Sequence, residues 1–409
     1  MRRGILGFAA VLMMVAGCHP PAPDYSAQLP PGTLALRKIP PSMYPSFATT
    51  PADLGRIHPA ILYSLEYLSK PSSQAFYPYA DITHDRAVAT LKALDELAQS
   101  AAAGQITADE IDARIRSDYE VYQSVGAPAP GGSGWTGKVL YTGYFTPIYN
   151  ASMTRGGAYQ WPLYKRPADL VSDPVTGQVL GRKLPNGQMV PQYYSRAQVE
   201  SGVLAGDELC WLTSRFEAYV VTVQGSGRLR LPDGSMYEVG FAGDNGYDYV
   251  SIGQQMVSDG VIPSDRLSLT TMREYFDAHP EALDKYLPAN PRTVFFTHRP
   301  GGPYGKLNEP VTAMGTIATD KEQHDIYPRA LSAFLVVPLP SPDGGSEPFR
   351  GFMLDQDTGG AIRAAGRCDI YMGVGQSAEE LAGREFTEGQ LYYIALKPEL
   401  MAKYLANGH

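Results

Sequence analysis

Hydrophobic and polar residues follow two different periods along this chain, and the change of period divides it. Between 85 and 100, apolar residues recur every three or four positions, which predicts a helix. Thr107-Ala-Asp-Glu110 has the spacing of a capping box and predicts the start of a second helix. The apolar residues that continue this helical spacing are Ile111, Ile115, Tyr119 and Tyr122. A Pro/Gly/Ser-rich stretch at 126–134 ends the helical block.

From Trp135 onward the period is close to two, which is typical of strands. Strands are expected at 138–147, 219–224, 228–231, 293–296, 333–339, 352–357, 369–374 and 390–395. Gly225-Ser226-Gly227 would form the turn between the second and third of these strands. Helices are expected at 250–258 and 270–287, the second interrupted by Pro280. The pattern predicts a mainly β protein with helices at its start.

The first residues have the features of a secretory signal. Met1-Arg-Arg is positive, and the apolar run 5–15 is too short to span a bilayer. Val15-Ala-Gly-Cys18 resembles a bacterial lipoprotein cleavage site, with residues 1–17 as signal peptide and Cys18 as the lipidated N-terminus. The alternative is an ordinary secretory signal with a chance cysteine. His19 follows in place of an aspartate retention signal, which favours the periplasmic face of the outer membrane.

Length, composition and charge limit the number of domains and the classes of ligand that the chain can bind. The Pro-rich segment 18–45 is expected to be an extended tether, and the rest is long enough for two domains. The net charge of −8 argues against a nucleic-acid partner. The histidines are scattered and no HExxH or CxxC motif is present, so no metal or other cofactor is expected. Whether Cys210 and Cys368 pair is left open.

Three aspartates near the C-terminus are the candidate acids. Asp355 and Asp357 would share one face of a strand, whose side chains repeat every two residues, and Asp369 opens the next strand. If Asp369 is buried among apolar groups its pKa rises, as a proton-donating acid near neutral pH requires. The alternative for Asp357 and Asp369 is a turn residue that bonds its own backbone. Asp355 fits structural support better than chemistry.

Asp357-Thr-Gly359 also has the form of an aspartic protease loop. That chemistry needs two such loops sharing a proton, and the chain has one. A dimeric protease is therefore a minor alternative.

Two further segments suit the recognition of sugars. Thr142, Tyr144 and Thr146 alternate hydroxyls and phenols around a glycine, and Gln224 and Ser226 lie in a second polar stretch. Aromatic faces cover sugar C–H surfaces, and hydroxyls both donate and accept hydrogen bonds. The alternatives are an amphipathic strand and a simple turn. The candidates for sugar stacking, each also compatible with a core position, are Trp135, Trp161 and Trp211.

Taken together these segments resemble the membrane-bound lytic murein transglycosylase A family. The motifs that carry the resemblance, in this order, are Thr142-Gly-Tyr-Phe-Thr-Pro147, Val223-Gln-Gly-Ser-Gly227, Phe241-Ala-Gly-Asp-Asn-Gly-Tyr247, Asn290-Pro291 with Val294-Phe-Phe296, and Asp357-Thr-Gly-Gly-Ala-Ile followed by Asp369-Ile-Tyr-Met-Gly373. The resemblance implies a double-psi β-barrel domain, named for three aspartates, with a smaller inserted β-domain and a groove between them. The implied barrel domain is 46–147 with 303–409, and the implied insertion is 148–302.

The resemblance also implies a reaction. Such enzymes cleave the β-1,4 bond between N-acetylmuramic acid and N-acetylglucosamine of peptidoglycan without water, and leave a 1,6-anhydro end. The muramyl C6 hydroxyl is an intramolecular nucleophile, so one acid can serve as both donor and acceptor of protons. Asp369 matches the catalytic aspartate, and Asp357 its supporting partner. The residues expected to line the groove are Thr142, Tyr144, Thr146, Gln224, Ser226 and Asp355.

Two segments depart from the family pattern, a longer insert around 169–189 and the residues after Asp320, and both are expected to be surface loops. The expected partners are peptidoglycan strands, the outer membrane through Cys18, and cell-wall synthase or scaffold proteins. The alternative function is a peptidoglycan-binding lipoprotein without catalysis.

Overall fold

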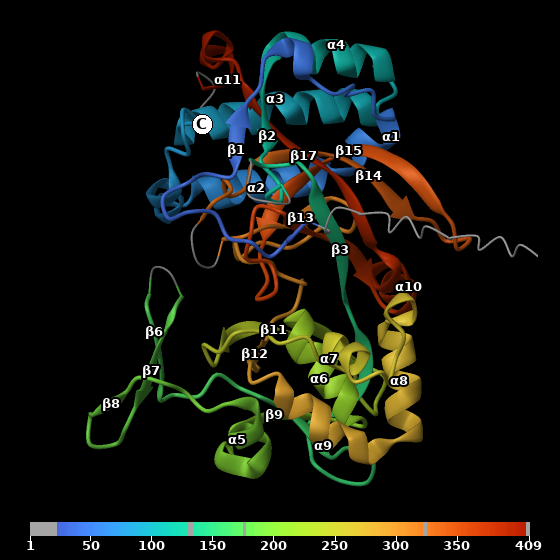
Figure 1. Ribbon diagram of the computed structural model, residues 1–409. Coiled ribbons are helices and arrows are strands. Elements are labelled where there is room, and N and C mark those ends of the chain that lie inside the picture. The colour runs from blue at the N-terminus through green and yellow to red at the C-terminus, as the bar shows by residue number, and fades with distance from the viewer. Residues whose placement is uncertain (1–22, 130–133, 175–176, 322–324, 406–409) are drawn as a thin grey trace, which may run out of the picture.

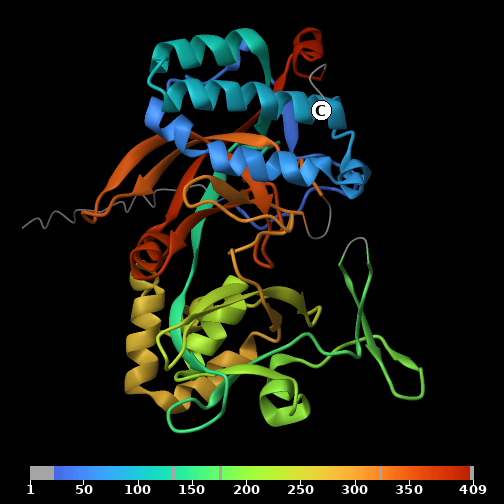
Figure 2. The same ribbon diagram turned by 180° about the vertical axis from the view of Figure 1, so that it is seen from behind.

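The computed structural model describes residues 23–129, 134–174, 177–321 and 325–405. Cys18 and the expected signal peptide lie outside these residues, so lipidation stays a prediction. Two bodies stand one above the other in Figures 1 and 2, a β-barrel covered by helices and a second domain of mixed structure.

The first body is a closed barrel. Among the described residues, six strands run in the order β17-β14-β15-β13-β16-β3, and β3 pairs again with β17. Their bounds are β3 (Val139–Thr146), β13 (Thr316–Ala318), β14 (Ser332–Pro340), β15 (Ser346–Asp357), β16 (Arg367–Val374) and β17 (Phe386–Leu396). β13 runs parallel to β15, and β16 parallel to β3. Closure leaves these strands no open edge.

Helices cover the barrel on one side (Figure 1). They are α1 (Pro51–Arg56), α2 (His58–Ser69), α3 (His84–Ala102) and α4 (Ala108–Asp118), and the short α11 (Ala402–Leu405) packs on α3. α10 (Gln376–Arg384) packs on β3 and β16. The predicted helix at 85–100 is confirmed as α3, whose Leu91 and Leu94 are fully buried. The capping box at Thr107 is also confirmed.

The prediction that Tyr119 and Tyr122 extend the helix after Thr107 is wrong. α4 ends at Asp118, and the two tyrosines belong to β2 (Tyr119–Ser124), which pairs with β17. Both rings are buried. Their spacing of three suits a helix, but pairing with a barrel strand satisfies the backbone and buries both side chains.

The expected tether also ends earlier than predicted. β1 (Leu36–Lys38) pairs with β2 and extends the barrel sheet. Ala35, Leu36 and Ile39 are buried in the core. The prolines on either side are compatible with a short edge strand, because a strand of three residues needs few backbone donors.

The second body is inserted between β3 and β13. Its main sheet has the order β12-β11-β10-β4-β9-β5, and a small sheet β6-β7-β8 projects to the side (Figure 2). The strands are β4 (Ile148–Ser152), β5 (Trp161–Tyr164), β6 (Leu170–Ser172), β7 (Val179–Lys183), β8 (Met189–Val190), β9 (Glu208–Leu212), β10 (Ser226–Arg230), β11 (Met236–Asp244) and β12 (Val294–His298). The helices are α5 (Arg196–Gln198), α6 (Arg215–Gln224), α7 (Ile252–Ser258), α8 (Leu269–Ala278) and α9 (Leu283–Tyr286).

The predicted strand at 219–224 is wrong, because these residues form the end of α6. Ser214 caps the helix by accepting a hydrogen bond from the amide of Glu217, and Gly225 ends it in the left-handed conformation at φ 75°. Phe216, Tyr219 and Val220 bury one helical face. The run of β-branched residues favours a strand locally, but the caps and the 3.6-residue burial pattern override it.

The fold class predicted from the sequence, a β-barrel with helices and a smaller inserted β-domain, is confirmed by this architecture. The exact domain limits at 148–302 stay a prediction. Cys210 in β9 and Cys368 in β16 are both buried free thiols in different domains. In the described part of the chain, no helix is both long and apolar enough to cross a membrane.

Candidate active site

Four residues on four neighbouring barrel strands form a row at the rim of the barrel. Asp369 of β16 lies opposite Thr142 of β3 on one side and opposite Ala318 of β13 on the other. Ala318 in turn lies opposite Asp357 at the end of β15. Neighbouring strands are about 4.8 Å apart, so the backbones of the two aspartates are roughly 10 Å apart. We call Thr142, Asp369, Ala318 and Asp357 the acid row.

The acid row lines a cleft between the two domains. The cleft has a volume of about 350 Å³, and α6 and β11 of the inserted domain form its opposite wall. A second hollow of about 350 Å³ continues from it, and the two share Tyr144, Gln224 and Asp357. The groove predicted between the domains is therefore present, and both candidate acids lie in it.

Asp369 is hydrogen-bonded and lies beside a cation. The Thr142 hydroxyl donates to Oδ1 of Asp369, and Nε of Arg367 lies 3.6 Å from the same oxygen. Nη2 of Arg367 also donates to the Thr142 hydroxyl at 3.2 Å. The apolar surroundings considered for Asp369 from the sequence are thus not what the structure shows. The guanidinium instead stabilises a carboxylate at this position.

Asp357 is a buried carboxyl group that accepts three hydrogen bonds. Burial raises the pKa of Asp357 to about 6, although three donors oppose this rise. The amides of Lys306 and Thr358 donate to Oδ1, each at 2.8 Å, and the Tyr144 hydroxyl donates to Oδ2 at 2.9 Å. Burial also raises the pKa of Tyr144, so its phenol remains a donor. Asp357 is held rigidly from three directions.

Asp355 does not line the groove, so the expectation that it contacts substrate is wrong. Its side chain is 0% exposed and pairs with Lys321, whose side chain is also 0% exposed. The Thr319 and Tyr393 hydroxyls donate to Oδ2 of Asp355 at 2.8 and 2.6 Å. The structural role considered for Asp355 fits this burial better.

Lys321 was expected on a surface loop, and the structure corrects this too. Its ammonium group donates to Asp355, to the Thr319 hydroxyl at 2.7 Å and to the backbone oxygen of Asp357 at 2.9 Å. Lys321 therefore ties the buried aspartate to the backbone of the candidate acid. The role follows from the parallel pairing of β13 with β15, which brings residues 36 positions apart together.

The remaining predicted groove residues separate into two groups. Thr142, Tyr144 and Gln224 line the cleft, and the Gln224 side chain accepts from the amide of Phe145 at 3.1 Å. Thr146 is buried, and its hydroxyl bonds those of Tyr371 and Ser226 at 2.9 and 3.3 Å. Thr146 thus supports the barrel end rather than contacting a ligand, and Ser226 lines the second hollow but not the cleft of the acid row.

The cleft also contains residues that were not among the predicted groove residues. Arg367 lies two positions before Asp369 on the same strand, and this alternation could have pointed to it. Phe386 of β17 lies opposite Thr142 and is 67% exposed. Phe241 lines the cleft from the other domain and is 42% exposed. Two exposed aromatic rings in one cleft suit the stacking of sugar faces.

Comparisons with known proteins agree with this architecture. Residues 140–297 match the MltA specific insert domain, and residues 315–395 match the 3D domain. Membrane-bound lytic murein transglycosylase A of Escherichia coli K12 is 31% identical over 269 residues, which cover 64% of this chain and 67% of that protein. The Vibrio cholerae protein of the same name is 28% identical over 275 residues, covering 65% of this chain and 68% of the relative.

Solved structures show the same fold. A membrane-bound lytic murein transglycosylase from Agrobacterium tumefaciens superposes with a TM-score of 0.69 at 24% identity, covering 90% of this chain and 99% of that one. The E. coli MltA structure with bound chitohexaose gives a TM-score of 0.67 at 22% identity, covering 92% of this chain and 98% of that one. By its sequence relatives and its two matching domains, the chain belongs to the membrane-bound lytic murein transglycosylase A family.

Proposed function

We propose that this protein is a lytic transglycosylase that cleaves the β-1,4 bond of peptidoglycan strands and leaves 1,6-anhydromuramyl ends. The observation that supports this most is the acid row, which faces a cleft flanked by exposed aromatic rings. The names of the relatives, and the chitohexaose bound to the E. coli protein, support a polysaccharide of β-1,4-linked amino sugars as substrate.

In the proposed reaction, Asp369 protonates the glycosidic oxygen, and its carboxylate then takes the proton of the muramyl C6 hydroxyl. That hydroxyl attacks the anomeric carbon of its own sugar, so the bond to the leaving sugar breaks as the anhydro ring forms, and no water is consumed. The hydrogen bond from Thr142 orients Asp369, and Arg367 stabilises the carboxylate that remains after proton donation.

Asp357 has a supporting role in this proposal, and it is also the alternative candidate for the catalytic acid. Its three hydrogen bonds fix the groove wall next to Ala318. Its pKa of about 6, raised by burial, is that of a group able to donate a proton near neutral pH. Separate asparagine variants of the two aspartates assign the roles.

We also propose that the protein is anchored at the periplasmic face of the outer membrane by a lipid on Cys18. The support is the signal-like segment at residues 1–17 and the membrane-bound character named in the relatives. Mass spectrometry of the N-terminal peptide from membranes tests this, and a Cys18→Ala form that remained fully membrane-associated would contradict it.

The test of the activity is the mass of the products released from purified murein sacculi. A transglycosylase releases muropeptides that are lighter by one water than those released by a hydrolase. Anhydro products are expected. Products that retain the water would show that the protein is a hydrolase and contradict the proposal. Binding to sacculi without release of products would favour the alternative, a peptidoglycan-binding lipoprotein without catalysis.

A further inference from the structure

An open hollow beside the cleft is not used by the proposed reaction. It has a volume of about 510 Å³, within the range of roughly 300 to 1,000 Å³ that is typical of ligand sites. The end of β11 and the loop after it form one side, and β6 and β7 form another. The segment 169–189, expected to be a surface loop, is therefore the small sheet β6-β7-β8 and supplies a wall of this side hollow.

Close contacts place the small sheet against both domains. Val179 of β7 packs on Gly246, where an added Cβ would lie 2.8 Å from the Cβ of Val179. Nζ of Lys306 lies 3.8 Å from the corresponding position at Gly177. Lys306 belongs to the segment that returns from β12 to the barrel strand β13. The side hollow thus lies between the small sheet, the loop after β11 and the returning segment.

The side hollow has an excess of positive charge. The charged residues that line it are Arg166, Arg292, Lys306, Arg363, Asp244 and Asp248. Arg292 pairs with Asp244 at 2.9 Å, and Arg363 pairs with Asp248 at 2.6 Å. Nη2 of Arg166 donates to two neutral oxygens, the backbone oxygen of Leu170 at 3.0 Å and the Ser172 hydroxyl at 3.3 Å. Within the described residues, neither Arg166 nor Lys306 has a carboxylate partner, so two positive charges remain for an anionic ligand.

The side hollow meets the cleft at an exposed side chain. Phe241 lines the side hollow, the cleft and the second hollow, and it is 42% exposed. Lys306 lines the side hollow and the second hollow, and its amide donates to Oδ1 of Asp357 at 2.8 Å. The Lys306 ammonium group is therefore within one lysine side chain of the amide that holds Asp357. An extended peptide covers about 3.5 Å per residue, so a stem of several residues on a sugar at the acid row is long enough to reach it.

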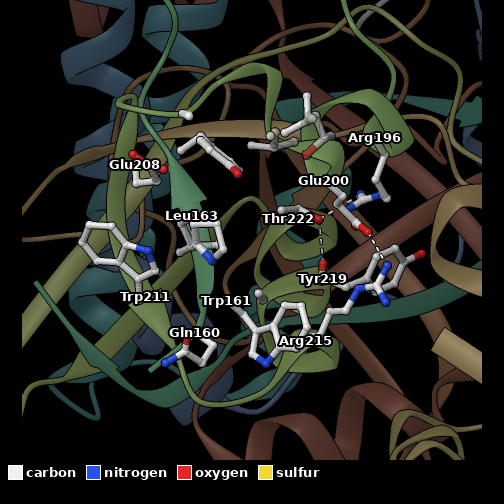
Figure 3. Close-up of a pocket in the computed structure, with 18 of the residues that line it drawn as sticks. Gln160, Trp161, Leu163, Arg196, Glu200, Glu208, Trp211, Arg215, Tyr219 and Thr222 are labelled. Atoms are coloured by element: carbon white, nitrogen blue, oxygen red, sulfur yellow. Dashed lines mark hydrogen bonds and ion pairs between the residues drawn. The ribbon is translucent and has the colours of Figure 1, made fainter. Parts of the chain in front are cut away.

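An inner cavity of the inserted domain, shown in Figure 3, lacks both of these properties. Arg196 is 4% exposed and bonds the Thr222 hydroxyl at 3.0 Å, and both residues belong to the wall between this cavity and the cleft. Arg215 pairs with Glu200 at 2.6 Å and with Asp284 at 2.5 Å. The inner cavity is thus separated from the cleft, and its charge is balanced.

We propose that the side hollow binds the peptide stem of a muramyl residue that lies in the cleft. This inference rests on the proposed function, because it names a further part of the same substrate. The stem has free carboxylates, which can form charge-assisted hydrogen bonds with Arg166 and Lys306. The glycan backbone has no charge, so an excess of positive charge does not fit a further stretch of sugar. Phe241 marks the branch point, with the glycan on one side and the stem on the other.

The test compares soluble glycan strands that carry their stems with the same strands after an amidase has removed the stems. Arg166→Met removes the charge, Arg166→Lys keeps it, and Arg230→Met is the control, because Arg230 is exposed on β10 and lines none of the three hollows. We expect Arg166→Met to raise KM for stem-bearing strands about threefold to fivefold, the range for an exposed ion pair, without changing kcat. KM for stripped strands should equal the wild-type value, as should both KM values of Arg166→Lys and of the control.

A wild-type rate on stripped strands also shows that Arg166→Met is folded. Lys306→Met is judged by the ratio of its two KM values, because the Lys306 amide also holds Asp357, and this ratio should rise as it does in Arg166→Met. Equal changes of KM on both substrates, or no change on either, would overturn the inference and leave the proposed function standing. A wild-type protein that releases nothing from either substrate would overturn the proposed function and the inference with it.

Calorimetric titration with the free stem peptide measures the contact directly. Binding to the wild type should weaken when the carboxylates of the peptide are amidated, and it should weaken by a similar factor in Arg166→Met. An amidated peptide that binds the wild type as tightly as the free acid would contradict the assignment.

Discussion

Replacing Asp357 with asparagine should make the protein more stable at neutral pH. The change removes a charge but keeps the hydrogen bonds. Oδ1 of asparagine can accept from the amides of Lys306 and Thr358 as the carboxylate does, and its amide nitrogen can donate to the Tyr144 hydroxyl, which now acts as the acceptor. What is lost is the cost of holding a carboxylate in a half-buried position.

The size and sign of the effect follow from the pKa of Asp357. Burial raises it from the ordinary 3.8 to about 6, so the folded protein keeps a proton that the unfolded chain releases between these values. Wild-type stability therefore falls as the pH rises from about 4 to 6, by at most about 3 kcal/mol. Water in the cleft reduces this cost, so we expect asparagine to add about 1 to 3 kcal/mol above pH 6 and nothing below about pH 4.

Urea unfolding at about pH 7.5 and about pH 4 measures this difference directly. Asp343→Asn is the control, because Asp343 is an exposed turn residue whose pKa is lowered by the Ser341 hydroxyl, and its removal should not stabilise the protein. The reasoning is refuted if Asp357→Asn is less stable than wild type at the higher pH, or if its advantage is the same at both pH values.

Three further changes test other parts of the structure. Lys321→Met leaves Asp355 buried without its cation and should lower the free energy of unfolding, measured in urea, by about 3 to 5 kcal/mol. The double variant Lys321→Met/Asp355→Asn should recover most of this loss. A loss below about 1 kcal/mol would contradict the buried pair. Thr142→Val removes the hydrogen bond to Asp369 and should lower kcat by about tenfold or more without changing the unfolding midpoint, while Thr142→Ser keeps activity. Ser214→Ala removes the cap of α6 and should cost about 1 kcal/mol in thermal unfolding, and an unchanged Tm would argue against the cap.

The barrel strands were predictable because the buried positions in each strand coincide with its apolar residues. β14 is an almost continuous apolar run that is buried along most of its length, and β16 and β17 also coincide with predicted strands. α6 was not predictable in the same way. Val220 and Val221 favour a strand by local preference, and the helix forms because it is capped at both ends and its apolar face packs against the sheet of the inserted domain.

The two aspartates of the cleft were also identified from the sequence, because glycines and a strand pattern surround them. Their partners were not. Lys321 lies in a predicted loop, yet the parallel pairing of β13 with β15 buries its ammonium group beside Asp355. Arg367 is an ordinary strand arginine until the parallel pairing of β16 and β3 brings it to Thr142. Such contacts depend on which strands lie side by side, and the residues of one strand do not show its neighbours.

The central claim is that Asp369 is the single acid and base of a cleavage without water. The most direct measurement is mass spectrometry of muropeptides released from sacculi by the wild type, Asp369→Asn and Asp357→Asn, each shown to be folded by urea unfolding. We expect anhydromuropeptides from the wild type, none from Asp369→Asn, and a reduced but measurable amount from Asp357→Asn. The claim is contradicted if Asp369→Asn releases anhydro products at the wild-type rate and Asp357→Asn releases none. That result would identify Asp357 as the catalytic acid.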